Sequence, residues 1–596
     1  MKKLFHSKKL PVLLIVFTFL LIAGCAAVSN VSSVWPGLLV VLLSFSVLFS
    51  SCKLNKKNKS NRQSANPPVI ADCNYSNIDL STLAAAEGFR IDGVNDNDYS
   101  GWSVSSAGDI NGDGIDDMLI GAKNAYNYAS GYYDAGSTYV IFGKSGATRS
   151  DIDLSALAAA DGFKIEGTDY SYGAGWSVSS AGDINGDGID DLLIGAPYAY
   201  AYASGYYDAG STYVIFGKSG ATRPDIDLSN LAAADGFKIE GAYDSDYSGW
   251  SVSSAGDING DGIDDMLIGA KGAYNYASYY DDAGSTYVIF GKSGATRSDI
   301  DLSALAAADG FKIEGAYNSD YSGWSVSSAG DINGDGIDDL LIGAPYAYTS
   351  SYYSGYPYYY SYYYYAGSTS VIFGKSGATR SDIDLSALAA ADGFRIDGAD
   401  YYGRAGWSVS SAGDVNGDGI DDLLIGAPYA YAYASSSDYA GSSYVIFGKN
   451  GATRSDIDLS ALAAADGFKI EGAYDSDYSG NSVSGAGDIN GDGIDDMLIG
   501  AYNADPSSRN SAGSSYFILG KSGATRSDID LSALAAADGF KIDGAADDDN
   551  SGWSVSSAGD VNGDGIDDML IGARYADPSS RNDAGSTYVI FGNRCN

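Results

Sequence analysis

Short apolar runs separated by Gly- and Asp-rich segments recur along residues 73–596. In one representative stretch, residues 176–180 and 237–240 alternate in size or polarity, residues 192–196 are continuously apolar, and residues 212–217 are β-branched and aromatic. Runs of this length bounded by turn-forming residues predict four short β-strands. The 78 Gly and 11 Pro of the chain agree with many tight turns between such strands.

The four-strand pattern is one copy of a repeat. The string Gly-Asp-Ile/Val-Asn-Gly-Asp-Gly-Ile-Asp-Asp occurs seven times, at intervals of 72 to 83 residues. Within each copy we expect a helix of one or two turns before the fourth strand, at residues 228–234 in the second copy, ended by Gly236. Seven four-stranded units predict an all-β fold, a seven-bladed β-propeller of four-stranded antiparallel blades. An open solenoid is the alternative.

The two ends of the repeat region favour a closed ring. Residues 89–92 match the fourth strand of a unit that lacks its first three strands, and the chain ends after a third strand at residues 588–592. Together they make one complete blade, so we expect the N-terminal strand to close the last blade. Cys73 and Cys595 align with consecutive repeat positions and are expected to lie within disulfide distance, with two free thiols as the alternative. A disulfide indicates an oxidising compartment and hence export.

The first 72 residues differ from the repeats. Lysines precede an apolar run that ends in Ile-Ala-Gly-Cys, so residues 1–25 are predicted to be a signal peptide with an ending that resembles the bacterial lipobox, and Cys25 to be lipidated. Residues 26–72 hold a second apolar segment and a basic flexible tether, and Cys52 is an alternative lipidation site. We expect an exported lipoprotein anchored in the membrane, on the cell surface or the periplasmic side. An uncleaved anchor and two membrane spans, which would leave the repeats in the cytoplasm, are the alternatives.

Charge and residue content exclude several functions. The chain carries a net charge of −41, and residues 73–596 hold 75 acidic and 26 basic residues. Such an acidic region repels phosphates, so no nucleic acid partner is expected. The only histidine, His6, lies in the predicted signal peptide, which excludes His-based triads and His-ligated zinc sites from the repeats.

The repeated string carries a candidate metal site. In the first copy, oxygen donors recur at positions one, three, five and nine (Asp109, Asn111, Asp113 and Asp117), and the main-chain carbonyl of Ile115 adds another. An all-oxygen set around a Gly-containing turn suits Ca²⁺. We expect about seven ions, one per blade, that staple the turn between the first two strands; sensing or bridging a ligand is the alternative. The predicted ligands of the other loops are Asp183, Asn185, Asp187, Ile189, Asp191, Asp257, Asn259, Asp261, Ile263, Asp265, Asp331, Asn333, Asp335, Ile337, Asp339, Asp414, Asn416, Asp418, Ile420, Asp422, Asp488, Asn490, Asp492, Ile494, Asp496, Asp560, Asn562, Asp564, Ile566 and Asp568.

The run Gly-Trp-Ser-Val-Ser, the acidic loop and the run Leu-Leu-Ile-Gly-Ala-Pro together resemble the FG-GAP repeat of the integrin α-subunit N-terminal propeller and of bacterial surface proteins. The resemblance spans nearly all of residues 73–596 and implies a calcium-binding propeller. Two departures from the family pattern concern packing. Trp stands where the family often has Phe, and the sixth copy has Asn481 at this position. The final Pro is present only in three copies, as Pro197, Pro345 and Pro428. Because no metal-dependent adhesion domain is inserted, integrin-type ligand recognition is not implied.

Tyrosines gather in the loops between the second and third strands, which antiparallel order places opposite the calcium loops. The enlarged loop of the fourth copy holds twelve Tyr from Tyr346 to Tyr365. Tyrosine suits protein or glycan surfaces, although self-packing low-complexity sequence is an alternative. We expect a non-enzymatic, calcium-stabilised adhesion or binding module; a carboxylate-based glycan-active enzyme and a purely structural surface protein are alternatives. The candidate ligand-binding residues are Tyr198, Tyr200, Tyr202, Tyr352, Tyr353, Tyr358 and Tyr362.

Overall fold

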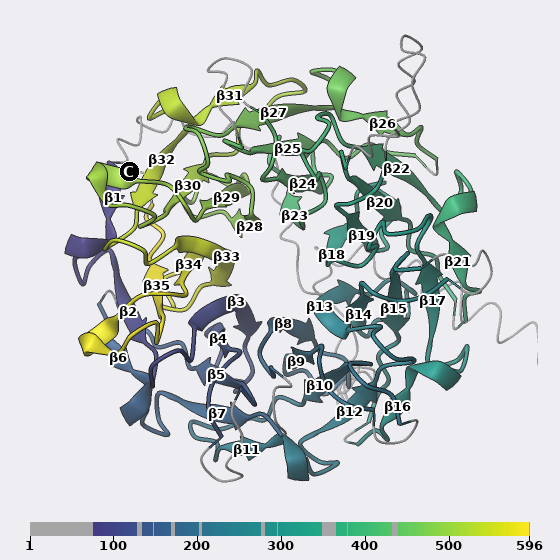
Figure 1. Ribbon diagram of the computed structural model, residues 1–596, viewed down its shortest axis with the longest axis horizontal. Helices are drawn as coiled ribbons and strands as arrows, with labels where there is room; N and C mark the ends of the chain where they lie inside the picture. The colour runs from purple at the N-terminus through teal and green to yellow at the C-terminus, as the bar shows by residue number, and fades with distance from the viewer. Residues whose placement is uncertain are drawn as a thin grey trace, which may run out of the picture. The chain divides into compact units, whose positions relative to one another are not determined.

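Seven small β-sheets surround a common axis in the computed structural model (Figure 1). They belong to the unit Ile70–Asn596, which we describe by itself. The structure describes residues 76–127, 134–146, 148–168, 173–201, 205–275, 281–294, 296–348, 365–377, 379–431, 439–451 and 453–594. The predicted signal peptide, tether, lipidation site and both disulfide cysteines therefore lie outside the described residues.

Each sheet is one blade with the same strand order from the axis outward. In blade one the order is β3 (Ser100–Gly108), β4 (Asp117–Ala122), β5 (Ser137–Ile141), β7 (Gly162–Glu166) and β11 (Ile226–Asp227). The first four strands pair antiparallel, as predicted. The fifth has only two residues, comes from the next repeat and pairs parallel with β7. Every repeat thus lends a short strand to the blade before it.

The other six blades repeat this order. Blade two contains β8 (Ser177–Gly182), β9 (Asp191–Ala196), β10 (Ser211–Ile215), β12 (Gly236–Glu240) and β16 (Ile300–Asp301). Blade three contains β13 (Ser248–Gly256), β14 (Asp265–Ala270), β15 (Ser285–Ile289), β17 (Gly310–Glu314) and β21 (Ile383–Asp384). Blade four contains β18 (Ser325–Gly330), β19 (Asp339–Ala344), β20 (Ser368–Ile372), β22 (Gly393–Asp397) and β26 (Ile457–Asp458). Blade five contains β23 (Ser408–Gly413), β24 (Asp422–Ala427), β25 (Ser442–Ile446), β27 (Gly467–Glu471) and β31 (Ile529–Asp530).

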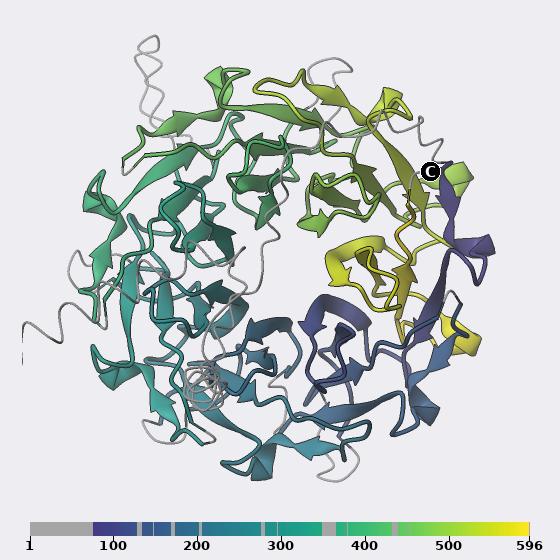
Figure 2. The same ribbon diagram turned by 180° about the vertical axis from the view of Figure 1, so that it is seen from behind.

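Blades six and seven include strands from both ends of the chain. Blade six contains β28 (Ser482–Gly487), β29 (Asp496–Ala501), β30 (Ser514–Ile518), β32 (Gly539–Asp543) and β1 (Ile78–Asp79). Blade seven contains β33 (Ser551–Gly559), β34 (Asp568–Ala573), β35 (Ser586–Ile590), β2 (Gly88–Asp92) and β6 (Ile152–Asp153). The pairing of β2 with β35 is antiparallel and in full register, from Gly88 with Ile590 to Asp92 with Ser586. The predicted closure is confirmed, and Figure 2 shows the purple N-terminal strands beside the yellow C-terminal ones.

Apolar residues fill the spaces between neighbouring blades. Every position of β9 is buried, because its two faces contact different blades. Leu192 and Ile194 belong to the core between blades one and two, whereas Leu193 belongs to the core between blades two and three. Two-sided burial therefore explains why the second strand of each repeat is continuously apolar, while the half-exposed inner strand alternates.

The predicted helix before the fourth strand is shorter than expected. It is a single 3₁₀ turn, η3 (Leu228–Asn230), in which the side chain of Asp227 accepts a hydrogen bond from the Ser229 amide and Leu231 already has an extended ψ of 115°. Equivalent turns recur as η1 (Leu80–Thr82), η2 (Leu154–Ala156), η4 (Leu302–Ala304), η5 (Leu385–Ala387), η6 (Leu459–Ala461) and η8 (Leu531–Ala533), and two further turns are η7 (Pro506–Ser508) and η9 (Pro578–Ser580). The described ranges contain no α-helix, and so none that is long and apolar enough to cross a membrane.

Candidate functional site

The two faces of the ring carry different loops, as antiparallel order predicts. On one face, the loop after the third strand contacts the acidic loop of the preceding blade, where the Gly146 amide donates to the Asn562 carbonyl at 2.9 Å. On the other, the loop after the fourth strand contacts the loop between the second and third strands, where the Asn97 amide donates to the Asn582 carbonyl at 2.8 Å. We call these the metal-loop face and the tyrosine face.

The acidic loop is folded by its own carboxylates. Asp109 accepts hydrogen bonds from the amides of Asp113 at 3.0 Å and Gly114 at 2.8 Å, and Asp113 accepts one from the Ile115 amide at 3.0 Å. Gly114 has a φ of +91°, a conformation that favours glycine. The string therefore forms a tight turn with its oxygen donors drawn around it.

At the base of this turn, a buried Asp and a buried Asn meet. Asp117 is fully buried and accepts hydrogen bonds from the Gly143 amide at 2.8 Å and from Nδ2 of Asn111 at 3.1 Å. Burial, with the nearby carboxylates of Asp113 and Asp109, raises the pKa of Asp117 to about 8. The Oδ1 atom of Asn111 is buried and has no hydrogen-bond partner among the described residues.

The same unpartnered oxygen recurs around the ring. It is found at the equivalent residues Asn185, Asn259, Asn333, Asn416 and Asn562. In the sixth loop the oxygen of Asn490 instead accepts from the Asp492 amide at 2.9 Å. A buried amide oxygen without a donor is costly, and its recurrence beside three carboxylates indicates a place for a cation.

The donor chemistry of the loop fits a hard divalent cation. Within the described ranges, no three acidic side chains converge into a formed metal cluster. Asp109 and Asp113 are turned toward amides of their own loop, and an ionised carboxylate with two oxygens keeps further acceptor capacity after such bonds. Carboxylate, amide and main-chain carbonyl oxygens are the ligands that Ca²⁺ prefers. The predicted ligand positions are therefore neighbours within one tight turn.

The eighth residue of the acidic string, counted from Asp109 as the first, links the acidic loops of neighbouring blades. The sequence alone did not identify it as a site residue. Oδ2 of Asp190 accepts a hydrogen bond from the amide of Asp109 in the preceding blade at 2.9 Å, and Oδ2 of Asp116 accepts one from Asp560 at 2.9 Å across the ring closure. The signal was present as an Asp-Asp pair in all seven copies. The position-eight aspartates are Asp116, Asp190, Asp264, Asp338, Asp421, Asp495 and Asp567.

On the tyrosine face, two of the candidate ligand-binding residues are described. The Tyr198 ring packs against Trp176 at a centroid distance of 5.4 Å, and the Tyr200 ring packs against Tyr207 at 5.1 Å. Tyr207 is 73% exposed. The other candidates, Tyr202, Tyr352, Tyr353, Tyr358 and Tyr362, lie outside the described residues. Part of this aromatic surface therefore packs on itself, and part faces solvent.

Tryptophans at the start of the inner strands form a chain of aromatic contacts around the axis. Trp102 lies between Trp176 and Trp553, with ring centroids 5.2 and 5.1 Å apart. The contacts continue from Trp176 to Trp250 at 4.6 Å, and then through Trp324 to Trp407. We call these six residues, all half-buried, the tryptophan collar.

The departure at Asn481 is filled by tyrosines from the adjoining loops. Tyr502 packs against Trp553 at 5.0 Å and stacks on Tyr478 at 5.5 Å. Tyr478 in turn contacts Tyr429, which packs against Trp407 at 5.5 Å. The aromatic ring at this end of the axis is therefore complete, although one blade contributes no Trp.

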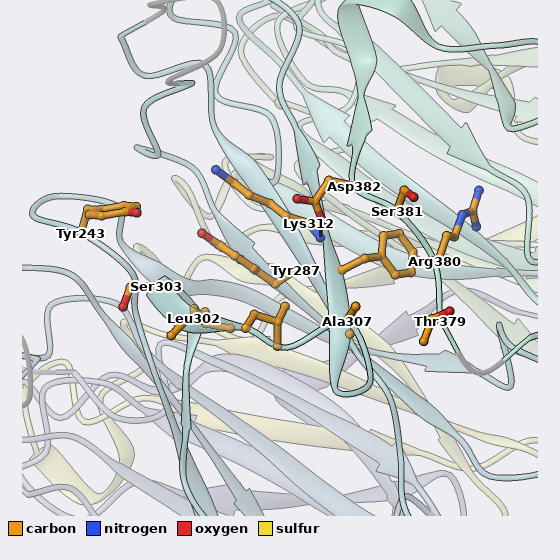
Figure 3. Close-up of a pocket in the computed structure, with 14 residues that line it drawn as sticks. Tyr243, Tyr287, Leu302, Ser303, Ala307, Lys312, Thr379, Arg380, Ser381 and Asp382 are labelled. Carbon is orange, nitrogen blue, oxygen red and sulfur yellow. Dashed lines mark hydrogen bonds between the residues drawn. The ribbon is translucent and has the colours of Figure 1, made fainter.

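A set of hollows at the outer rim repeats from blade to blade. One of 630 Å³ is lined by Tyr287, Leu302, Lys312 and Asp382, shown in Figure 3, and the equivalent hollow of the preceding blade measures 490 Å³. Their polar groups are satisfied locally: Lys312 pairs with Glu314 at 3.3 Å, and Asp382 accepts a hydrogen bond from the Lys312 amide at 2.9 Å. We interpret these hollows as crevices between a fourth strand, the 3₁₀ turn that precedes it and the segment that leads into the fifth strand.

Comparison with known proteins agrees with this architecture. The FG-GAP repeat family model matches residues 100–141, 174–215, 248–289, 322–371, 405–446, 479–518 and 551–590, half of the chain. Integrin alpha-PS5 and integrin alpha-PS2 of Drosophila melanogaster are 32% and 27% identical over 185 and 348 residues, and phosphatidylinositol-glycan-specific phospholipase D of Mus musculus is 30% identical over 238 residues. These matches cover 30%, 56% and 40% of this chain. They cover only 16%, 21% and 24% of the relatives, so the chain spans about a quarter or less of the curated proteins it matches.

Proposed function

Since the chain belongs to the FG-GAP repeat family, we propose that its propeller is a calcium-stabilised binding module that recognises a protein or a glycan through the tyrosine face. The observation that carries this proposal is the division of the ring into two faces. Identical acidic loops, each hydrogen-bonded to the next blade, build one face, whereas aromatic and variable loops build the other. Loops held on a rigid scaffold are where binding residues are usually placed.

Calcium is assigned a structural role in this proposal, with one ion in each acidic loop. The side chains of positions one, three, five and nine and the carbonyl of position seven would hold it. The unpartnered Asn oxygens and the closely spaced carboxylates support the assignment. A bound cation would neutralise part of the acidity and hold the loop against the position-eight aspartate of the next blade.

Binding of the protein to arrays of glycans and extracellular proteins, measured with calcium and with EDTA, tests which face binds. The decisive variant deletes residues 349–364, which lie between the paired Tyr348 and Tyr365 of blade four. Deletion of residues 432–438, the corresponding loop of blade five, is the matched control. Binding abolished by the first deletion and retained after the second supports the proposal, whereas glycan cleavage without binding favours a carboxylate-based enzyme.

The names of the relatives denote two kinds of protein, integrins and a phospholipase, and both kinds are similar to this chain. The module is proposed to be non-enzymatic because the described repeats contain no His and because the acidic positions at their centre recur in every copy. A catalytic pair is expected to break that symmetry.

We place the module outside the cytoplasm, anchored by its N-terminal segment, with Cys25 lipidated and Cys73 bonded to Cys595. Both chain ends attach to blade six, where Asn77 accepts a hydrogen bond from the Lys541 amide at 3.0 Å and the Asn593 amide donates to the Ile489 carbonyl at 2.9 Å. Mass spectrometry of the mature protein, with and without reduction, tests the lipid and the disulfide together. An unmodified N-terminus starting at Met1 and two free thiols would contradict both.

A further inference from the structure

Two lysines lie over the tryptophan collar. Nζ of Lys271 is 3.0 Å from the ring centroid of Trp250 and 4.5 Å from that of Trp324. Nζ of Lys123 is 3.7 Å from Trp102 and 4.6 Å from Trp176. Each ammonium therefore sits between the rings of two adjacent blades, in the geometry of a cation–π contact.

Two arginines extend this cationic group around the axis. Cζ of Arg574 is 3.2 Å from the ring centroid of Trp553 and 5.0 Å from that of Trp102. Cζ of Arg404 is 4.2 Å from the Tyr429 ring and 5.7 Å from the Trp407 ring. We call Lys123, Lys271, Arg404 and Arg574 the collar cations.

The collar cations differ from nearly all other described bases of the propeller, because they form no ion pair with a described carboxylate. Among the described residues, 21 of the 26 Lys and Arg side chains form ion pairs with Asp or Glu. The remaining five are the four collar cations and Arg594, near the end of the chain. The repeat region holds 75 acidic residues, yet these four cations around the axis form no ion pair with a described carboxylate; Asp134 and Asp282 act on Lys123 and Lys271 only from a distance.

These positions also break the symmetry of the repeats. Lys123, Lys271 and Arg574 stand where Pro completes the Gly-Ala-Pro run in three other copies. Burial lowers the pKa of Lys271 to about 7 and that of Lys123 to about 8, so holding these lysines charged disfavours the folded state. A position that departs from its repeat and destabilises the fold is better explained by binding than by packing.

We propose that the collar binds a carboxylate-bearing polysaccharide, with the uronate groups on the half-buried Lys123, Lys271 and Arg404, and the sugar rings on the exposed parts of the tryptophans; Arg574 is buried and supports the ring of Trp553. The inference rests on the proposed function and names the ligand class of the tyrosine face. Carboxylates form charge-assisted hydrogen bonds with Lys and Arg. The apolar faces of sugars match half-buried indole rings, which favours an acidic glycan over an acidic peptide.

The test measures binding of short galacturonate oligomers to the full-length chain in detergent with calcium present. The same oligomers as methyl esters supply an uncharged sugar, sulfated dextran supplies a different anion, and glutamate oligomers supply an acidic peptide. The variant is K123Q/K271Q. Its matched control is K144Q/K218Q, which removes the same charge from two lysines that pair with Asp161 and Asp235 on the metal-loop face.

We expect the wild-type chain to bind galacturonate and not its methyl ester, with an affinity that falls as salt is added. K123Q/K271Q is expected to weaken binding at least about tenfold, because each lysine supplies a charge-assisted contact. K144Q/K218Q should stay within about twofold of wild type, and K123R/K271R should retain most of the affinity. Thermal unfolding of each variant shows whether the fold is kept.

Four results would overturn the inference: equal losses in both glutamine pairs, glutamate or sulfated dextran bound as tightly as galacturonate, equal binding of the methyl ester, or no galacturonate binding by the wild-type chain. In the last case, another ligand captured by the tyrosine face on the arrays leaves the proposed function standing. A chain that captures no array ligand at all contradicts the proposed function itself.

Discussion

Ile91 of β2 is paired with Thr587 of β35 across an antiparallel ladder, although almost the whole propeller separates them in sequence. The pair belongs to the seventh blade, whose inner three strands come from the C-terminus and whose fourth comes from the N-terminus. Five blades are therefore built from consecutive segments of the chain, whereas blade six takes the two-residue β1, and blade seven its whole fourth strand, from the opposite end. The stability of blade seven limits the stability of the ring.

This asymmetry predicts different responses to the same substitution in two blades. Ile91 and Ile239 occupy equivalent, fully buried positions of blades seven and two. We expect Ile91→Ala and Ile239→Ala each to cost about 2–5 kcal/mol locally. Hydrogen exchange under reducing conditions should quicken through β2 and β35 in the first variant, and remain confined to blade two in the second. Equal exchange in β2 for both variants would contradict this.

The two adjacent aspartates of an acidic loop are expected to have separate roles. Asp191→Asn removes a buried carboxylate predicted to bind calcium, so the number of ions bound should fall by one and the calcium-dependent rise in unfolding temperature should shrink. Asp190→Asn keeps an oxygen that can accept from the Asp109 amide and should leave the number unchanged. Equilibrium dialysis with metal analysis measures both, and an unchanged count in Asp191→Asn argues against the ligand assignment.

In the last two repeats, loops with an arginine stand in place of the tyrosine-rich loops, and each arginine clamps a short outer strand. Arg509 forms two hydrogen bonds to Asp79, both of 3.0 Å, and Arg581 forms two to Asp153, of 3.0 and 2.9 Å. The carboxylates are partly exposed, so each clamp should contribute about 1 kcal/mol or less. Arg509→Gln should quicken amide exchange in β1, and Arg581→Gln in β6. Each variant is the control for the other, and a shared pattern of exchange would refute separate clamps.

A buried aspartate in the loop before blade three predicts a pH dependence. Burial raises the pKa of Asp246 to about 7, from 3.8, against the opposing effects of Lys312 and the Tyr243 amide. The folded chain thus binds a proton that the unfolded chain releases, so this residue makes the protein less stable as pH rises from about 4 to 7. We expect a contribution of about 1–2 kcal/mol between pH 5 and pH 7.

Urea unfolding at saturating calcium measures this contribution. Asp246→Asn should make the fall in stability between pH 5 and pH 7 shallower, because its side chain does not titrate. The equivalent Asp320, Asp477 and Asp549, whose pKa values burial also raises to about 7, keep part of the slope. Asp547→Asn, an exposed aspartate at the equivalent position after blade six that accepts a hydrogen bond from the Asn510 amide, is the control and should keep the wild-type slope. A wild-type slope in Asp246→Asn would rule out Asp246 as its source.

The main strands and the ring closure could be predicted because each repeat contains its own signals. Residues 192–196 are apolar since both faces of β9 are buried, and residues 89–92 matched a strand whose partners lay at the other end of the chain. By contrast, β11 escaped prediction because Ile226–Asp227 is two residues long and its partner lies in the preceding blade. The predicted helix is a single 3₁₀ turn because Asp227 caps its start and Leu231, with an extended ψ, ends it.

The sites were predictable to different degrees. The acidic loops could be found because seven copies share one spacing, although the role of Asp190 needed the position of the neighbouring blade. The collar cations could not be predicted from the sequence. Lys123 and Lys271 are single replacements at a position where other copies have Pro, and the Trp rings that each lysine contacts come from two different blades. Tyr198, a predicted ligand-binding residue, packs against Trp176 and Tyr247 and supports the collar.

Because β2 must wait for β35, the order of synthesis becomes part of the folding problem. This early strand is among the last to find its partner, and until residues 586–590 arrive its edge is open to other chains. A polypeptide that stops early lacks the final ladder however well its middle blades have formed. Only chains that contain residues 586–590 can complete the circle, so closure reports that synthesis has passed the last strand of the ring.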